Sequence, residues 1–435
     1  RLITLRSAVQ IRPPQPIKMS LFNFSENTRK KKDIILSLLF CSFPVALITG
    51  NLLTNTYIIL IGLIHFIFSF DKSYFKNKVF IILSILFLSL VINLFFSQNV
   101  ILSYPRVLKF IFVIFFILSF GYLVNANEKN LNYIYNSWLI VLLLFSVDIL
   151  IEYKFGKNIF GMSSYMPGRL SGLFGEELVA GYFFFGFAFL MFGHIVVKYN
   201  PKKLFLFILF IIIIFMSLII GERSNFLKVF IGISTIIFII INEKFFKKIV
   251  VLLLVLSMSV GFIFLNENYK WRFYNQVEII FEKDGFDKYL KSSEYGAHYD
   301  TAYKIFERNK VFGIGIKNFR EESSKSIYRN NEYTYTSNRS KTHPHQIHFE
   351  LLAETGLFGY SVFIIFIVFS LYLALREYFK RKSIYQLSSI VFISVSLLPY
   401  LPSGSFYSSF NSSIFWLNYA IMMSFVFKKN NWNFY

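Results

Sequence analysis

The chain has 435 residues, of which 55% are hydrophobic and only 16% are charged, a composition that lies far outside the soluble globular range. The formal net charge of +21 does not indicate nucleic-acid binding, because the basic residues form short clusters between apolar runs. Composition therefore predicts a membrane protein and excludes a nucleic-acid partner.

The first residues do not read as a natural N-terminus. No Met opens the stretch 1–18, whereas the sequence from Met19 onward resembles the start of a protein. We expect residues 1–18 to be a non-native upstream segment and exclude them from the fold prediction.

About twelve apolar runs follow, each close to the ~20 residues that cross a bilayer. They lie near 33–50, 52–70, 78–97, 104–124, 132–153, 178–198, 204–220, 224–241, 248–265, 347–375, 386–402 and 411–427. These runs predict an all-α polytopic membrane protein with about twelve transmembrane helices. Nine helices would lie within 19–265, and the last three, with a cytoplasmic tail, within 346–435.

The basic clusters orient these helices. With the N-terminus inside, the Lys/Arg-rich loops alternate onto one side, whereas the opposite short loops are poor in Lys and Arg. Because positively charged loops remain cytoplasmic, this alternation places two longer segments, 154–177 and 266–345, outside. The larger of the two contains a predicted amphipathic helix at 299–309 and forms a loop domain between the ninth and tenth helices.

Histidine and glutamate residues are concentrated where this loop meets the tenth helix. We expect that helix to begin just after Pro344, which would place His345 at the positive end of the helix dipole and keep its imidazole neutral. A neutral imidazole at an aqueous cavity is a competent general base, although a histidine that only caps a helix is an alternative. His345 and His348 would share a helix face, so a metal site is a further alternative. Gly356 and Gly359 favour close helix packing.

Cationic residues predict an anion site on the same side. Arg223 follows the seventh span directly, where an arginine is costly unless it has an anionic partner; Glu222 is one candidate and a phosphate is another. The outer loops also supply Arg169, His298 and Arg320. No Asp-x-Asp pair, Walker-type loop or dinucleotide fingerprint occurs, so the substrate must arrive already activated.

The motif at 345–359 resembles the signature of the O-antigen ligase and O-antigen polymerase superfamily. In that signature a histidine and an amide or small polar residue precede a glycine, two variable residues and a further glycine, here His345, Gln346, Gly356 and Gly359. The stretch 309–320 resembles the family element in which a hydrophobic residue precedes Gly-x-Gly-x-x-Asn-Phe. Segments 168–183 and 221–225 are also similar, so the resemblance covers most of the chain.

The resemblance implies a GT-C-like glycosyltransferase that takes glycan from an undecaprenyl diphosphate carrier, without a metal or other cofactor. His345 matches the catalytic histidine, with Gln346, Glu354, Gly356 and Gly359 as supporting residues. Arg223 matches an arginine that holds the diphosphate. The second diphosphate arginine has no clear match, and His298, Arg320 and Arg169 are the remaining candidates for that role.

The resemblance also implies a bacterial inner-membrane location with the active site facing the periplasm. The acceptor would be lipid A–core for a ligase or a glycan repeat unit for a polymerase in lipopolysaccharide or polysaccharide biosynthesis, and a protein acceptor is a third possibility. A carrier-lipid or polysaccharide flippase or transporter is the alternative from a different class. Such a protein would not require a long loop that ends in an imidazole, and it should carry ionisable residues at mid-membrane.

Overall fold

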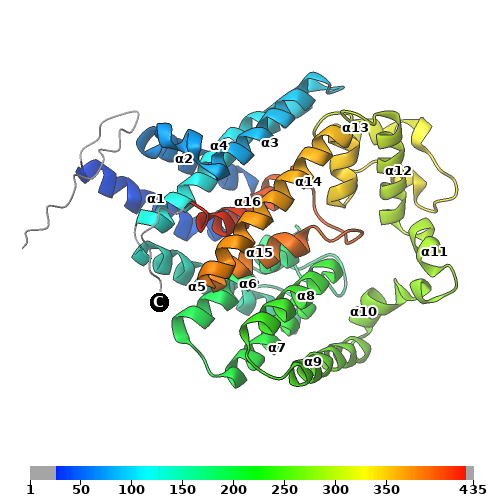
Figure 1. The fold of residues 1–435 in the computed structure, drawn as a ribbon. Coiled ribbons are helices and arrows are strands. Elements are labelled where there is room, and N and C mark those ends of the chain that lie inside the picture. Colours follow the sequence, from blue (N-terminus) through cyan, green and yellow to red (C-terminus); the bar gives the residue numbers. More distant parts are fainter. Residues whose placement is uncertain (1–25, 127, 428–435) are drawn as a thin grey trace, which may run out of the picture.

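The computed structural model describes residues 26–126 and 128–427, and within them every extended regular element is a helix (Figure 1). The predicted all-α fold class is therefore confirmed. The stretch 1–18 lies outside the described residues.

Ten of the described helices are long and apolar enough to cross a membrane, which confirms a polytopic membrane protein. They are α1 (Glu26–Thr49), α2 (Asn51–Ser69), α3 (Lys78–Phe95), α4 (Val100–Ala126), α5 (Glu128–Phe155), α6 (Ala180–Tyr199), α7 (Lys203–Ile220), α8 (Arg223–Ile240), α9 (Phe245–Leu265) and α14 (Ile347–Arg381). A short 3₁₀ turn, η1 (Lys72–Lys76), precedes α3.

The last two predicted spans correspond to shorter helices. Helix α15 (Ile384–Ser396) has 13 residues and α16 (Ser409–Ser424) has 16, both below bilayer length. The predicted run 386–402 was too long because Pro399 and Pro402, which cannot continue a helix, follow α15. Helix α15 packs against α6 and α8, and α16 packs against α4 and α6. Nearly all of α16 is buried, so longer helices shield it.

The segment between α9 and α14 forms a separate group of short helices (Figure 1). It contains α10 (Glu267–Lys270), the π-helical turn η3 (Trp271–Asn275), η4 (Glu278–Phe281), α11 (Gly285–Ser292), α12 (Glu294–Arg308), α13 (Phe319–Ser324), η5 (Ser326–Tyr328) and η6 (Thr336–Asn338). The predicted helix at 299–309 is confirmed within α12. Helix α12 begins earlier than predicted because the Ser293 side chain accepts a hydrogen bond from the Gly296 N–H and caps it.

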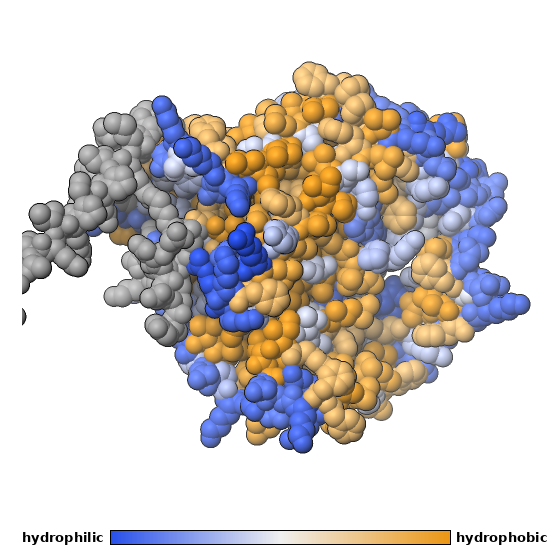
Figure 2. All heavy atoms as spheres, in the orientation of Figure 1, coloured by the Kyte–Doolittle hydropathy of each residue, from blue (hydrophilic) through white to orange (hydrophobic). Residues whose placement is uncertain are grey.

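Hydrophilic residues gather over α11–α13, whereas the long helices present a broad apolar surface (Figure 2). At the end of the bundle that carries this segment, connections far apart in the sequence hydrogen-bond to one another. The N–H of Gln98 donates to Ile314 O at 2.9 Å, and that of Leu170 donates to Ile220 O at 2.9 Å. These contacts assemble one polar layer from several loops, including 156–179, which contains the 3₁₀ turn η2 (Gly172–Phe174).

Helix α14 is broken near its start, at Gly356, whose φ of 62° and ψ of −170° are non-helical. A glycine is needed there, because a Cβ would lie 2.4 Å from Val311 O and the backbone is in the left-handed region. The segment 310–315 satisfies the backbone groups around the break: Ile314 N donates to Ala353 O at 3.1 Å, and Leu357 N donates to Lys310 O at 2.8 Å. The first two turns of α14 are thereby fixed to the loop segment.

Candidate active site

His345 lies outside α14. The helix begins at Ile347, and its N-cap is Gln346, whose side-chain Oε1 accepts from the N–H groups of His348 (2.7 Å) and Phe349 (3.1 Å). His345 precedes this cap with a left-handed φ of 57°, and its carbonyl accepts from Ser403 N at 2.8 Å. The helix was expected to begin just after Pro344, at His345, and it begins two residues later, because the Gln346 side chain supplies the cap.

Two other histidines surround His345. Its ring centroid lies 4.1 Å from that of His343 and 5.2 Å from that of His298, the latter in a stacked arrangement. Tyr295 on α12 approaches edge-on at 5.9 Å. No described group hydrogen-bonds to the His345 ring. By contrast, the His298 ring is hydrogen-bonded within the protein, because its Nε2 donates to Asn338 O at 3.2 Å.

The electrostatics of this group keep His345 neutral. Burial lowers its pKa to about 4, and the nearby His298, Lys341 and Arg169 act in the same direction. Burial and the neighbouring His345 and Lys317 lower the pKa of His343 further. At neutral pH an unprotonated imidazole therefore faces the site, which is the state in which a histidine accepts a proton.

His348 does not share a site with His345. Its Nε2 donates to Leu397 O at 2.8 Å, and its Nδ1 is 3.1 Å from the Tyr360 hydroxyl, so both ring nitrogens are engaged. The expectation of a common helix face was wrong because His345 is not helical. Among the described residues no group of three or more His, Cys, Asp or Glu is arranged to hold a metal ion.

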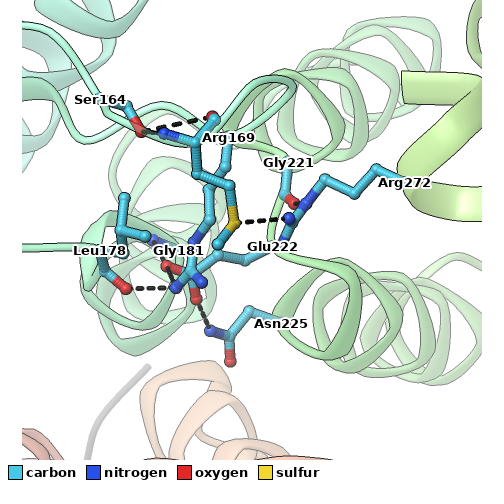
Figure 3. Close-up of polar contacts among 9 residues, drawn as sticks. Ser164, Arg169, Leu178, Gly181, Gly221, Glu222, Asn225 and Arg272 are labelled. Atoms are coloured by element: carbon cyan, nitrogen blue, oxygen red, sulfur yellow. Dashed lines mark hydrogen bonds and ion pairs between the residues drawn. The ribbon is translucent and has the colours of Figure 1, made fainter. Parts of the chain in front are cut away.

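Arg169 and Glu222 form the centre of a cationic cluster beside this group. Arg169 Nη2 lies 2.8 Å from Glu222 Oε1, and the guanidinium also donates to Leu178 O (Figure 3). The Glu222 carboxylate further accepts from the Gly181 N–H at 3.2 Å. Glu222 is thus paired across the site with Arg169 and not, as its position in the sequence suggested, with the adjacent Arg223.

Arg223 and Arg272 complete this arginine cluster. Arg223, the first residue of α8, donates from Nη1 to Arg272 O at 3.0 Å. Arg272 Nε donates to Gly221 O at 2.7 Å, and Nη1 approaches Met166 Sδ at 2.8 Å (Figure 3). Burial, with the neighbouring arginines, lowers the pKa of Arg272 to about 10, so its guanidinium remains charged at neutral pH.

Arg272 was not identified from the sequence. It lies in η3, directly after α10, and it is only 7% exposed. One sequence signal could have identified Arg272: it stands between two aromatic residues, Trp271 and Phe273, near the start of a polar loop. Arg320, one candidate for this role, is instead exposed on α13, and His298 contacts His345, so neither stands where Arg272 does.

The remaining supporting residues act on the backbone around α14. Glu354 is fully buried, and its Oε1 accepts from Phe319 N at 3.3 Å, which holds α13 against the helix. Gly359 lies against Thr355 of its own helix, where a Cβ would come within 2.4 Å. Gly356 permits the break described above. Gly356 therefore allows the loop segment at Val311 to approach α14 closely, whereas Gly359 lies against its own helix, so neither glycine shows the expected contact with another helix.

Residues 208–364 match the family model described as O-antigen ligase. This segment, about a third of the chain, is similar to O-antigen ligase domains. The match confirms the resemblance to the O-antigen ligase and polymerase superfamily. No match was found among curated proteins.

The matched segment contains most of the site. It includes Arg223, Arg272, the histidine group and the broken start of α14, whereas Arg169 comes from the preceding connection. This similarity implies a membrane enzyme of the glycosyltransferase or ligase type that acts on lipid-linked glycans.

Proposed function

We propose that the protein transfers glycan from an undecaprenyl diphosphate carrier to a sugar hydroxyl of an acceptor at the periplasmic face of the bacterial inner membrane. The observation that carries this proposal is that a cationic cluster lies near the neutral imidazole of His345, to whose ring no described group hydrogen-bonds. The arginines would bind the carrier diphosphate, and His345 would act as general base.

The charges of the cluster suit a diphosphate. Three guanidinium groups, those of Arg169, Arg223 and Arg272, gather around the single carboxylate of Glu222, which leaves an excess of two positive charges among these four groups. Buried charges of one sign are costly without a counterion. A carrier diphosphate carries one negative charge on each phosphate, and guanidinium groups bind phosphate oxygens in a bidentate manner.

The reaction assigned to this site is a single displacement. The acceptor hydroxyl oxygen forms a bond to the anomeric carbon, and its proton passes to His345. The bond from the anomeric carbon to the phosphate oxygen breaks, and the electron pair leaves with the diphosphate. The arginines stabilise the charge that develops on the leaving group, so a metal ion is not required. Attack opposite the diphosphate inverts the anomeric centre.

Reconstitution tests this function. Purified protein in liposomes, given carrier-linked glycan and an acceptor, should transfer glycan in excess EDTA, and His345→Ala should abolish transfer. Absence of transfer with every acceptor, or activity that requires an added divalent ion, would contradict the proposal. A deletion strain distinguishes the two acceptor classes: single repeat units on the lipid core indicate a polymerase, and carrier-linked polymer without transfer to the core indicates a ligase.

A further inference from the structure

An open groove begins one residue beyond His345. Its volume is about 690 Å³, within the range of small-ligand sites, and Gln346 and residues of α12, α14 and the 397–400 connection line it. A row of rings connects it to the histidine group. Tyr295, which contacts His345 at 5.9 Å, stacks on Tyr299 at 6.4 Å, and Tyr299 lines the groove.

The walls of the groove combine aromatic faces with a few polar atoms. The aromatic side chains are Tyr299, Tyr303, Tyr333, Phe349, Tyr360 and Tyr400. Such faces pack against the C–H faces of sugar rings, and tyrosine hydroxyls bond at the wet edge. This composition resembles neither a lipid-filled cavity, which needs no polar edge, nor a phosphate site.

Two polar side chains in the groove retain bonding capacity. Gln346 is 1% exposed, and its Nε2 has no partner among the described groups, although its Oε1 caps α14. A buried donor of this kind is costly unless a ligand or water accepts from it. The Asp300 carboxylate is held by Asn330 Nδ2 at 3.2 Å and Lys304 Nζ at 3.0 Å, and it can accept further bonds from sugar hydroxyls.

The groove lacks the positive charge of the arginine cluster. No Lys or Arg is among its lining residues, and its one acidic residue is Asp300. A diphosphate would therefore bind preferentially at the cluster, whose Arg169 acts electrostatically on His345. Because a single displacement requires the nucleophile to enter opposite the leaving group, the groove is placed to hold the attacking partner.

We infer that this groove binds the saccharide of the acceptor, stacks it on Tyr303 and Tyr333, and delivers one hydroxyl to His345. The inference rests on the proposed transferase function and adds to it the acceptor subsite. Gln346 then acts on both sides of the active centre: its Oε1 fixes the start of α14, and its Nε2 donates to an acceptor oxygen.

Tyr303 provides the test, because its side chain is 49% exposed and no hydrogen bond fixes it in the core. With rough lipopolysaccharide or carrier-linked repeat unit, whichever the wild type uses as acceptor, Tyr303→Ala should raise KM for the acceptor by about three- to tenfold, the worth of one aromatic stack. The kcat at saturating acceptor should change little. Tyr303→Phe should keep the wild-type KM, since the stacking face remains.

Three further measurements make the result decisive. The Kd for undecaprenyl diphosphate, which carries no sugar, should be unchanged in Tyr303→Ala. Tyr333→Ala should reproduce the KM effect, whereas Tyr335→Ala, an exposed tyrosine of the same loop outside the groove, should not. An unchanged acceptor KM in both groove variants, or a rise in KM for the donor instead, overturns the inference while leaving the transferase intact. Absence of transfer by the wild type would remove the proposed function, and this subsite with it.

Discussion

The arginine cluster and the histidine group lie next to each other, and the same physical effect gives them opposite states. Burial lowers the pKa of Arg272 to about 10 and that of His345 to about 4. Because neutral pH lies between these values, the guanidinium stays charged and the imidazole stays neutral. One region can therefore hold a dianion while its neighbour accepts a proton.

The two regions also differ in how the chain fixes them. The arginines donate to backbone carbonyls and to Glu222, so their positions are set before any ligand binds. His345 is held through its backbone, in a left-handed conformation ahead of the Gln346 cap, and no described group bonds to its ring. We therefore assign diphosphate binding to the preorganised arginines and proton transfer to the His345 ring, which has no hydrogen-bond partner among the described groups. Variants can separate the two roles.

The largest expected effect follows from removing the proton acceptor. His345→Ala should reduce the transfer rate by about 10²–10⁴, the usual contribution of a positioned general base, and leave undecaprenyl diphosphate binding near the wild-type level. Steady-state kinetics and a carrier-binding assay on the same preparation measure the two quantities. His345→Gln keeps size and polarity but cannot take the proton, so it should be equally impaired.

His194→Gln, on α6, is the matched control, because that ring is already hydrogen-bonded at both nitrogens and lies outside the histidine group, the arginine cluster and the groove. We expect it to lose stability more than catalysis. Recovery of activity in His345→Gln, or loss of carrier binding in both His345 variants, would indicate a structural role for His345. The arginine cluster and the histidine group would then not have separate functions.

A smaller effect is expected at the arginine cluster. Arg272→Lys keeps the charge but not the planar pair of donors, so we expect kcat/KM to fall about tenfold or more, equivalent to ~1.4 kcal/mol of transition-state stabilisation. Undecaprenyl diphosphate binding should weaken in the same variant, in contrast to His345→Ala.

Arg223→Lys should behave as Arg272→Lys does. Arg320→Lys, which changes an exposed residue of α13 in the same loop segment, should keep the wild-type kcat/KM and carrier Kd. Equal losses in Arg320→Lys would place the diphosphate elsewhere, and wild-type kinetics in both Arg272→Lys and Arg223→Lys would make these arginines structural.

Sequence patterns predicted the features that depend on local chemistry. Apolar runs predicted the ten long helices, and the resemblance of one motif to a family signature drew attention to His345, Gln346 and Gly356. The same patterns overextended α15, because hydropathy does not register that Pro399 ends a helix. They also gave His348 a helical relation to His345, since a side-chain cap at Gln346 shifts the helix start and cannot be read from residue spacing.

Contacts between distant segments could not be predicted. Arg272 joins Arg223 only because η3 folds back onto the turn before α8, where it donates to Gly221 O. Glu222 pairs with Arg169, which stands far earlier in the chain. A charged residue in a sequence offers several partners, and the folded backbone selects among them. The cluster is therefore a product of tertiary structure, and only Arg223 and Arg169 were among its predicted members.

The smallest expected effect concerns the electrostatic link between the two regions. Since the pKa of His345 is lowered to about 4, kcat/KM should stay constant as the pH falls through 6.5 and decline only as it approaches that lower value. Lys341 contributes to the lowering, so Lys341→Gln should raise the pKa of His345 and move the acid limb upward by about 0.3–0.5 pH units. Lys310→Gln, which changes an exposed lysine that does not contribute to this pKa, should leave the acid limb of the pH profile unchanged.

The acid limb of the kcat profile should lie at higher pH than that of the kcat/KM profile, because the bound diphosphate favours the imidazolium form of His345. An acid limb near pH 6.5 in the wild type would mean that burial does not lower the pKa of His345. Identical acid limbs for kcat and kcat/KM would mean that the bound diphosphate is too far from His345 to affect this pKa.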